Sequence, residues 1–160
     1  MTQRSVSQGS FTIERTYDAS PGGVFRAFAD PMAKTAWFRG PEEWGGGEHE
    51  MDFRVGGRET NRVGPPGGPV HVFNATFQDI VPGERIISTY EMLFDETRIS
   101  VSLAIAEFKA AGGGTRLIYT EHGAFLDGFD GVASREEGTR DLLDKLGVAL
   151  AREAASAPAG

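Results

Sequence analysis

Apolar and polar residues alternate along the first segment of the chain, which is typical of a half-buried strand. Residues 10–17 show this period of two, although Arg15 interrupts the apolar face. Ser20-Pro21 and Asp30-Pro31 then each place an N-cap residue before a proline at the first helical position. The pattern predicts one strand followed by two short helices, the second of which ends near Gly40.

The alternation returns after a glycine-rich loop and continues through most of the remaining chain. Residues 48–55 alternate, and Gly56-Gly57 predicts a tight turn that pairs residues 58–63 back antiparallel. Further strand-like runs separated by short turns cover residues 70–80, 85–93, 97–108 and 115–122. Consecutive strands with short connections predict an antiparallel meander.

The last element has the period of a helix. Ser134 with Glu137 three positions on matches a capping box, and Leu143 and Leu146 share one face of a helix expected from residue 135 to about residue 155. At 1.5 Å per residue such a helix is about 30 Å long, enough to cross a sheet. The element order therefore predicts an α+β fold, with a curved antiparallel sheet of six to seven strands around a long C-terminal helix and a cavity that this helix cannot fill.

Composition narrows the class of protein. The 160 residues include 23 acidic and 16 basic ones, a net charge of −7 that argues against nucleic acid as a partner. Cysteine is absent, which excludes disulfides and thiol chemistry. No run approaches the ~20 apolar residues of a membrane span. We expect no stable membrane insertion, a cytoplasmic location, and a single domain over residues 10–155 between flexible ends at 1–9 and 156–160.

Four passages carry a resemblance to a known superfamily. They are Arg15–Pro21 with Val24–Phe28, Asp30–Phe38, Asp52–Gly57, and Gly114–Phe125. With the element order, they make the chain similar to the START-like superfamily, also called SRPBCC or birch-pollen-allergen-like, and within it to the subgroup similar to the activator of the ATPase of heat-shock protein ninety. The resemblance spans nearly the whole chain and implies a helix-grip fold.

The resemblance implies a cavity without naming its occupant, because the superfamily includes lipid and hormone carriers, polyketide cyclases and chaperone regulators. We expect the chain to bind a small hydrophobic or aromatic molecule between the sheet and the last helix. The alternatives are an enzyme for cyclisation, dehydration or isomerisation, and an interaction module that contacts a chaperone. A homodimer is left open.

The last predicted strand carries the residues best suited to catalysis. Alternation places Leu117, Tyr119 and Glu121 on one face. If that face lines the cavity, desolvation raises the pKa of Glu121, which then acts as a general base while Tyr119 polarises a carbonyl. The alternative is that Glu121 lies in solvent at the end of its strand. The thin inventory of reactive groups favours binding over catalysis.

Other residues are candidates for ligand contact. Tyr90 and Glu91 lie on opposite strand faces, and we assign Tyr90 to the cavity. Val101 and Leu103 belong to an alternation that we expect to form an apolar floor. Gly147 suggests close packing or room for a ligand, since glycine destabilises a helix by about 0.5–1 kcal/mol relative to alanine. The expected ligand contacts are Trp37, Phe53, Phe73, Tyr90, Val101, Leu103, Tyr119, Glu121, Leu143, Leu146 and Gly147.

Metal and cofactor motifs are absent from the sequence. His49, His71 and His122 lie on different predicted strands without a ligand spacing such as H-E-x-x-H. Gly112–Gly114 joins two strands instead of a strand and a helix, so it is no phosphate-binding loop. We expect neither a metal nor a cofactor.

Overall fold

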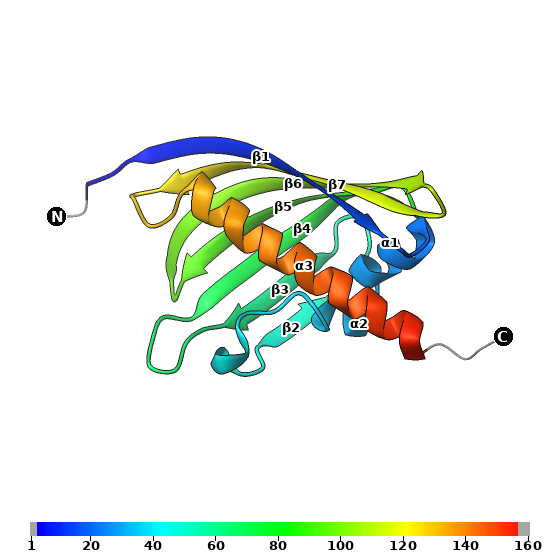
Figure 1. Cartoon of the computed structure of the whole chain (residues 1–160). Coiled ribbons are helices and arrows are strands. Elements are labelled where there is room, and N and C mark those ends of the chain that lie inside the picture. Colours follow the sequence, from blue (N-terminus) through cyan, green and yellow to red (C-terminus); the bar gives the residue numbers. More distant parts are fainter. Residues whose placement is uncertain (1–2, 157–160) are drawn as a thin grey trace.

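The computed structural model describes residues 3–156, and these form one curved sheet packed against helices (Figure 1). The strands are β1 (Val6–Tyr17), β2 (Glu48–Met51), β3 (Arg58–Val63), β4 (His71–Val81), β5 (Arg85–Phe94), β6 (Thr97–Ala111) and β7 (Gly114–Leu126). The helices are α1 (Pro21–Ala29), α2 (Pro31–Thr35), the 3-10 turn η1 (Glu42–Trp44) and α3 (Val132–Ser156). None of these helices is long and apolar enough to cross a membrane.

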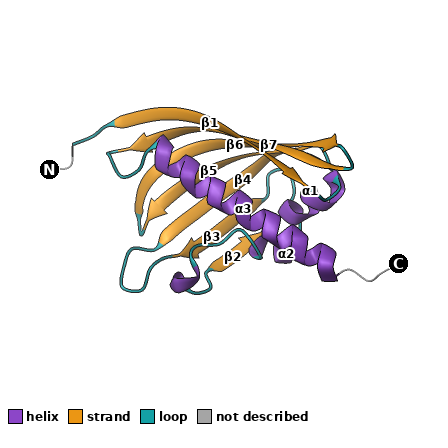
Figure 2. Cartoon of the chain, viewed as in Figure 1, coloured by secondary structure: helices purple, strands orange, loops and turns teal. Residues whose placement is uncertain are grey.

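The sheet has seven strands in the order β1-β7-β6-β5-β4-β3-β2, and every neighbouring pair is antiparallel. Strands β2 to β7 form the predicted meander, and β1 returns to pair with β7. Figure 2 shows α3 lying across the concave side of this sheet, with α1 and α2 near the C-terminal half of α3. The predicted α+β helix-grip architecture is confirmed.

The two short helices begin where the sequence predicts. The side chain of Ser20 accepts a hydrogen bond from Gly23 N at 3.1 Å, and Asp30 accepts one from Met32 N at 3.3 Å. Each cap satisfies a backbone N–H that the first helical turn leaves without a partner.

The predicted capping box of α3 is wrong. The helix begins at Val132, so Ser134 lies inside its first turn, where the hydroxyl donates to Asp130 and to the Gly131 carbonyl. Asp130, which precedes the helix, is the side chain that accepts a hydrogen bond at this end of α3.

Two chain ends differ from the expected domain boundaries. β1 begins at Val6, which pairs with Leu126, four residues before the expected boundary at residue 10. α3 continues to Ser156, and the rest of the expected flexible tail, residues 157–160, lies outside the described residues.

The concave face of β6 is the opposite of the predicted one. Ile99 has no partner opposite it, because Met92 pairs with Ser100 and Leu93 with Arg98. Beyond this β-bulge the small residues of the strand face inward, and Val101, 47% exposed, lies on the convex side together with Leu103. The expected apolar floor of Val101 and Leu103 is therefore wrong. Small inward side chains leave open space beneath α3.

Candidate functional site

A cavity of about 540 Å³ lies between the concave face of the sheet and α3. Rings form much of its wall. Those of Phe38 and Phe73 meet edge to face with centroids 5.0 Å apart, and those of Phe73 and Tyr90 are tilted with centroids 4.8 Å apart. The apolar side chains in the wall include Phe28, Trp37, Phe38, Phe73, Phe77, Ile86, Met92, Phe94, Ile99, Leu142 and Leu143.

Glu121 faces this cavity from β7 and is only 4% exposed. Its Oε1 accepts a hydrogen bond from the hydroxyl of Tyr90, and its Oε2 accepts one at 3.0 Å from the hydroxyl of Tyr119. Glu121 and Tyr119 lie two residues apart on the concave face of β7, while Tyr90 reaches them from β5. The alternation that predicted this face is confirmed, and Glu121 lies inside the protein, not in solvent.

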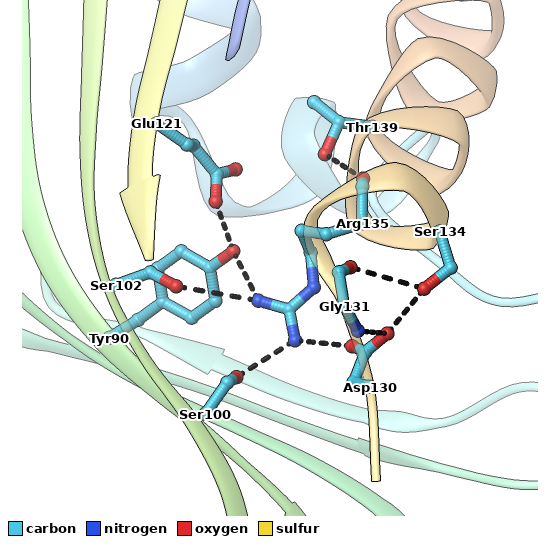
Figure 3. A network of polar contacts seen from close by, with 9 residues as sticks. All are labelled: Tyr90, Ser100, Ser102, Glu121, Asp130, Gly131, Ser134, Arg135 and Thr139. Carbon is cyan, nitrogen blue, oxygen red and sulfur yellow. Dashed lines mark hydrogen bonds and ion pairs between the residues drawn. The ribbon is translucent and has the colours of Figure 1, made fainter. Parts of the chain in front are cut away.

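Arg135 connects the first turn of α3 to the sheet (Figure 3). Its Nη1 donates to the hydroxyl of Tyr90 at 2.9 Å and to Ser102 Oγ at 3.4 Å. Its Nη2 donates to Ser100 Oγ at 2.8 Å and forms an ion pair with Asp130 at 2.8 Å. The hydroxyl of Tyr90 therefore lies between Arg135 and Glu121: it accepts a hydrogen bond from the guanidinium and donates one to the carboxyl group.

Burial dominates the electrostatics of this group. It raises the pKa of the Glu121 carboxyl, although the hydrogen bonds from both phenols and the charge of Arg135 oppose the rise. Burial and the charge of Glu121 also raise the pKa of Tyr90 and that of Tyr119, so both phenols stay protonated and act as donors. The pKa of Asp130 is lowered, because its hydrogen bonds and Arg135 outweigh the effect of burial.

A second buried polar group lies where α2 meets β2 and β3. Lys34 Nζ is 2.6 Å from Oε1 of Glu59, and His49 Nε2 is 2.7 Å from Oε2 of the same carboxylate. Glu59 is 1% exposed, and burial alone would raise its pKa, but Lys34 and His49 together outweigh burial and lower it. Glu59 is therefore an ionised carboxylate paired with a cation. Lys34 and Glu59 both line the cavity.

Four rings of the cavity wall form a row. The ring centroids of Trp44 and His71 are 4.8 Å apart, those of His71 and Phe94 4.7 Å, and those of Phe94 and Phe129 6.5 Å. Burial lowers the pKa of His71, which favours its neutral form.

The structure brings together six of the eleven residues that the sequence assigned to ligand contact. They are Trp37, Phe73, Tyr90, Tyr119, Glu121 and Leu143. These residues come from the segment after α2, from three strands and from α3, so only the folded chain places them around one space.

The other five expected contacts do not line the cavity. Val101 and Leu103 face the convex side, as described above. Phe53 lies after the end of β2 and packs against Phe25 and Phe77, with ring centroids at 5.7 and 4.9 Å. Leu146 is fully buried in the core.

Gly147 serves close packing. A Cβ added there would lie 3.3 Å from Cε1 of Tyr17, so the glycine lets α3 approach β1. The hydroxyl of Tyr17 donates to the carbonyl of Leu143 at 2.7 Å in the same contact. Of the two alternatives that the sequence left open for Gly147, the structure favours packing over room for a ligand.

Sequence reasoning missed the charged residues of the cavity. Arg135 was treated only as the start of a helix, and Lys34 and Glu59 received no role. Alternation could not find Glu59, because residues 58–62 of β3 contain no apolar position that marks the inner face. Within residues 3–156, no group of three or more His, Cys, Asp or Glu side chains is arranged to hold a metal ion.

A curved antiparallel sheet that holds a long C-terminal helix over a cavity defines the class: this is the helix-grip fold of the SRPBCC superfamily. Residues 18–151 match the family described as "Activator of Hsp90 ATPase homolog 1-like protein", and the chain belongs to this family. The comparison with curated proteins gave no match.

Solved structures share the fold over nearly the full chain. A protein from Rhizobium leguminosarum is 43% identical, with a TM-score of 0.89 over 94% of this chain and 99% of that one. The Mll3558 protein from Rhizobium loti is 48% identical, with a TM-score of 0.83 over 91% of this chain and 99% of that one. DynU16, from the dynemicin biosynthetic locus, is 17% identical with a TM-score of 0.64 over 88% of this chain and 46% of that one, which shows the fold alone.

Proposed function

We propose that the protein binds a small hydrophobic or aromatic molecule in the cavity between the sheet and α3. The observation that carries this proposal is a space of about 540 Å³ walled mainly by aromatic and aliphatic side chains. The family fold commonly binds hydrophobic ligands, which supports the same function. Small residues on β6, such as Ala104 and Ala106, keep the space open at positions where larger side chains would fill it.

Burial of the ligand supplies the affinity. At about 25 cal/mol per Å², enclosing roughly 300 Å² of apolar ligand surface contributes about 7 kcal/mol before the entropy of association is subtracted. We therefore expect dissociation constants between about 10 μM and 1 mM for compounds of two or three fused rings. Binding of this strength is measurable by thermal shift at high ligand concentration.

The test is a thermal-shift screen of aromatic and aliphatic compounds with a variant that blocks the cavity. Gly138 lines the cavity from α3, and a Cβ added there meets no atom within 4 Å. Gly138→Phe therefore adds a ring at a position that lines the cavity and where the new Cβ meets no neighbouring atom, and replacing a helical glycine favours the helix. Val148→Phe, at a position of α3 that is 53% exposed, adds the same ring outside the cavity and serves as the matched control.

The proposal predicts that a bound compound raises the melting temperature by the amount that follows from RT ln(1 + [L]/Kd). The shift should persist in Val148→Phe and shrink in Gly138→Phe. A screen without any shift, or shifts that are equal in the two variants, would contradict binding in this cavity.

A second candidate function is proton-transfer catalysis by Glu121. The observation that favours it is a buried carboxyl with a raised pKa that faces the cavity beside Tyr119. A compound from the screen that is also turned over by the wild type, and not by Glu121→Gln, would support it. Unchanged turnover in Glu121→Gln would contradict it.

A contact with a chaperone, a homodimer and a cytoplasmic location stay predictions from the sequence. Within residues 3–156, the exposed large hydrophobic side chains lie on six separate segments, so they form no run along any one element. They are Val6, Met32, Val55, Val101, Phe129 and Val148. This scatter favours the cavity over an apolar docking surface.

A further inference from the structure

The charged groups at the helix side of the cavity are already occupied by the protein itself. Arg135 directs four of its five N–H groups to Asp130 and to the hydroxyls of Tyr90, Ser100 and Ser102. Its charge is matched by the ion pair with Asp130 at 2.8 Å. A bidentate contact between this guanidinium and an acidic ligand would require those bonds to break, so Arg135 is no ready receptor for a carboxylate.

The second charged group is matched in the same way. Lys34 is paired with Glu59 at 2.6 Å, and its ammonium lies 4.6 Å from the ring centroid of Phe38. Both Glu59 oxygens have partners, since His49 contacts the second one at 2.7 Å. The pair brings no net charge to the cavity, and an anionic or cationic ligand would have to displace one of its members.

Glu121 is the exception among the described charged residues of the cavity interior. Among residues 3–156, its only hydrogen-bond partners are the hydroxyls of Tyr90 and Tyr119, and no cation of that range lies within ion-pair distance of it. A carboxylate has about four lone-pair sites, and two of them are used here. The carboxyl group therefore retains acceptor capacity at a wall that is otherwise aromatic and aliphatic.

We infer that the ligand is a neutral aromatic compound with a hydroxyl group, and that this hydroxyl donates a hydrogen bond to Glu121. The inference rests on the proposed function and narrows the class of ligand. The protein's own contacts show the geometry, because two phenol hydroxyls already donate to this carboxyl. A ligand hydroxyl adds a third donor of the same kind, while the ring of the ligand packs among the rings of Phe73, Phe38 and Trp37.

The groups around Glu121 disfavour the other simple ligand classes. A ligand carboxylate at this position would lie against Glu121, and Arg135, the cation that acts on Glu121, is already paired with Asp130. An ammonium group at this position would lie near the like charge of Arg135. The guanidinium of Arg135 donates to the hydroxyl of Tyr90 at 2.9 Å, and that hydroxyl in turn donates to Glu121. An ether or a hydrocarbon of the same shape has no hydroxyl to donate to Glu121. It would bury a free acceptor site of the carboxyl group without a partner, which lowers the affinity.

The test uses three probes with the same fused rings: 2-naphthol, 2-methoxynaphthalene and 2-naphthoate. Their dissociation constants are measured by calorimetry at pH 7 with the wild-type chain and four variants. Glu121→Leu removes the acceptor, and Glu121→Gln keeps the size of the side chain with a weaker acceptor. Tyr119→Phe removes one competing donor, and Ser88→Ala removes a different hydroxyl that lines the cavity.

We expect the wild type to bind 2-naphthol about tenfold more tightly than 2-methoxynaphthalene, as one hydrogen bond to a buried acceptor provides, and 2-naphthoate least tightly. This ratio should persist in Ser88→Ala, persist or increase in Tyr119→Phe, decrease in Glu121→Gln and approach one in Glu121→Leu. If Glu121→Leu does not fold, the loss of preference in Glu121→Gln decides the matter.

The outcomes separate this inference from the proposed function. Equal binding of 2-naphthol and 2-methoxynaphthalene by the wild type would leave cavity binding in place and overturn the role of the hydroxyl. A preference for 2-naphthoate, or a naphthol preference that survives in Glu121→Leu, would also overturn it. Binding of none of the three probes would overturn the inference and contradict the proposed function as well.

Discussion

The buried contact between Lys34 and Glu59 offers a prediction whose magnitude follows from the structure. Lys34→Met removes the ammonium 2.6 Å from a carboxylate that is 1% exposed, and it keeps most of the length of the side chain. Glu59 is then left buried with only His49 as a partner. Loss of one member of a buried ion pair lowers the free energy of unfolding by about 3–5 kcal/mol, a large part of the roughly 5–15 kcal/mol of a typical domain.

Urea denaturation followed by tryptophan fluorescence measures this change, since Trp37 lies in the core between α2 and the cavity. The matched control is Arg54→Met, which removes an ion pair with Asp52 whose side chains are 67% and 58% exposed. An exposed pair contributes about 0–1 kcal/mol. The double variant Lys34→Met with Glu59→Gln should be less destabilised than the sum of the two single variants, because it leaves no uncompensated charge.

The acid limb of the stability profile provides an independent check. The folded-state pKa of Glu59 is lowered, so its contribution to stability is present above the usual carboxyl pKa and is lost as the pH falls through the folded value. Glu59→Gln should therefore lose less stability in acid than the wild type does. A Lys34→Met variant as stable as Arg54→Met, or strictly additive single variants, would refute the buried ion pair.

Five further substitutions test other parts of the structure. Burial raises the folded-state pKa of Glu121, so its stabilising contribution is full below the usual carboxyl pKa and is lost as the pH rises through the folded value. The melting temperature of Glu121→Gln should therefore fall less than that of the wild type over this pH range. A pH profile equal to that of the wild type would contradict the burial of Glu121. Tyr17→Phe removes a buried hydrogen bond to α3 and should lower the free energy of unfolding by about 1 kcal/mol in urea, whereas no change would contradict that contact. Gly147→Leu forces a side chain against Tyr17 and should lower the same free energy by about 1–3 kcal/mol without altering ligand affinity; loss of binding with intact stability would return Gly147 to the cavity. Val101→Lys should change the free energy of unfolding by less than about 0.5 kcal/mol. Ala104→Lys buries a charge and should strongly lower the melting temperature. A larger effect of Val101→Lys than of Ala104→Lys would overturn the assigned faces of β6.

Local patterns predicted the elements of this fold well. Ser20 and Asp30 mark helix starts through chemistry that acts within three residues, and alternation in β7 identifies its inner face, so short segments of sequence contain what is needed. The failures lie where a neighbouring element decides the outcome. The bulge at Ile99 depends on how β5 and β6 pair, and it reverses the inner face of β6 beyond that residue.

The site could be predicted only in part for a related reason. Glu121 and Tyr119 were found because both lie on one strand with a clear period. Arg135 and Glu59 are themselves charged residues at inner positions, so hydrophobic periodicity gives no signal for them. Their roles depend on partners far along the chain, such as Ser100 for Arg135 and Lys34 for Glu59.

The central claim is that a small aromatic molecule occupies the cavity between the sheet and α3. Nuclear Overhauser effects between 2-naphthol and the methyl groups of the protein test it most directly, because methyl groups lie on both faces of the sheet. If the ligand lies there, we expect contacts to Ile86, Ile99 and Leu142, which line the cavity, and none to Val101 or Leu103 on the convex face. Contacts to the convex methyl groups alone, or no contacts at saturating 2-naphthol, would contradict it.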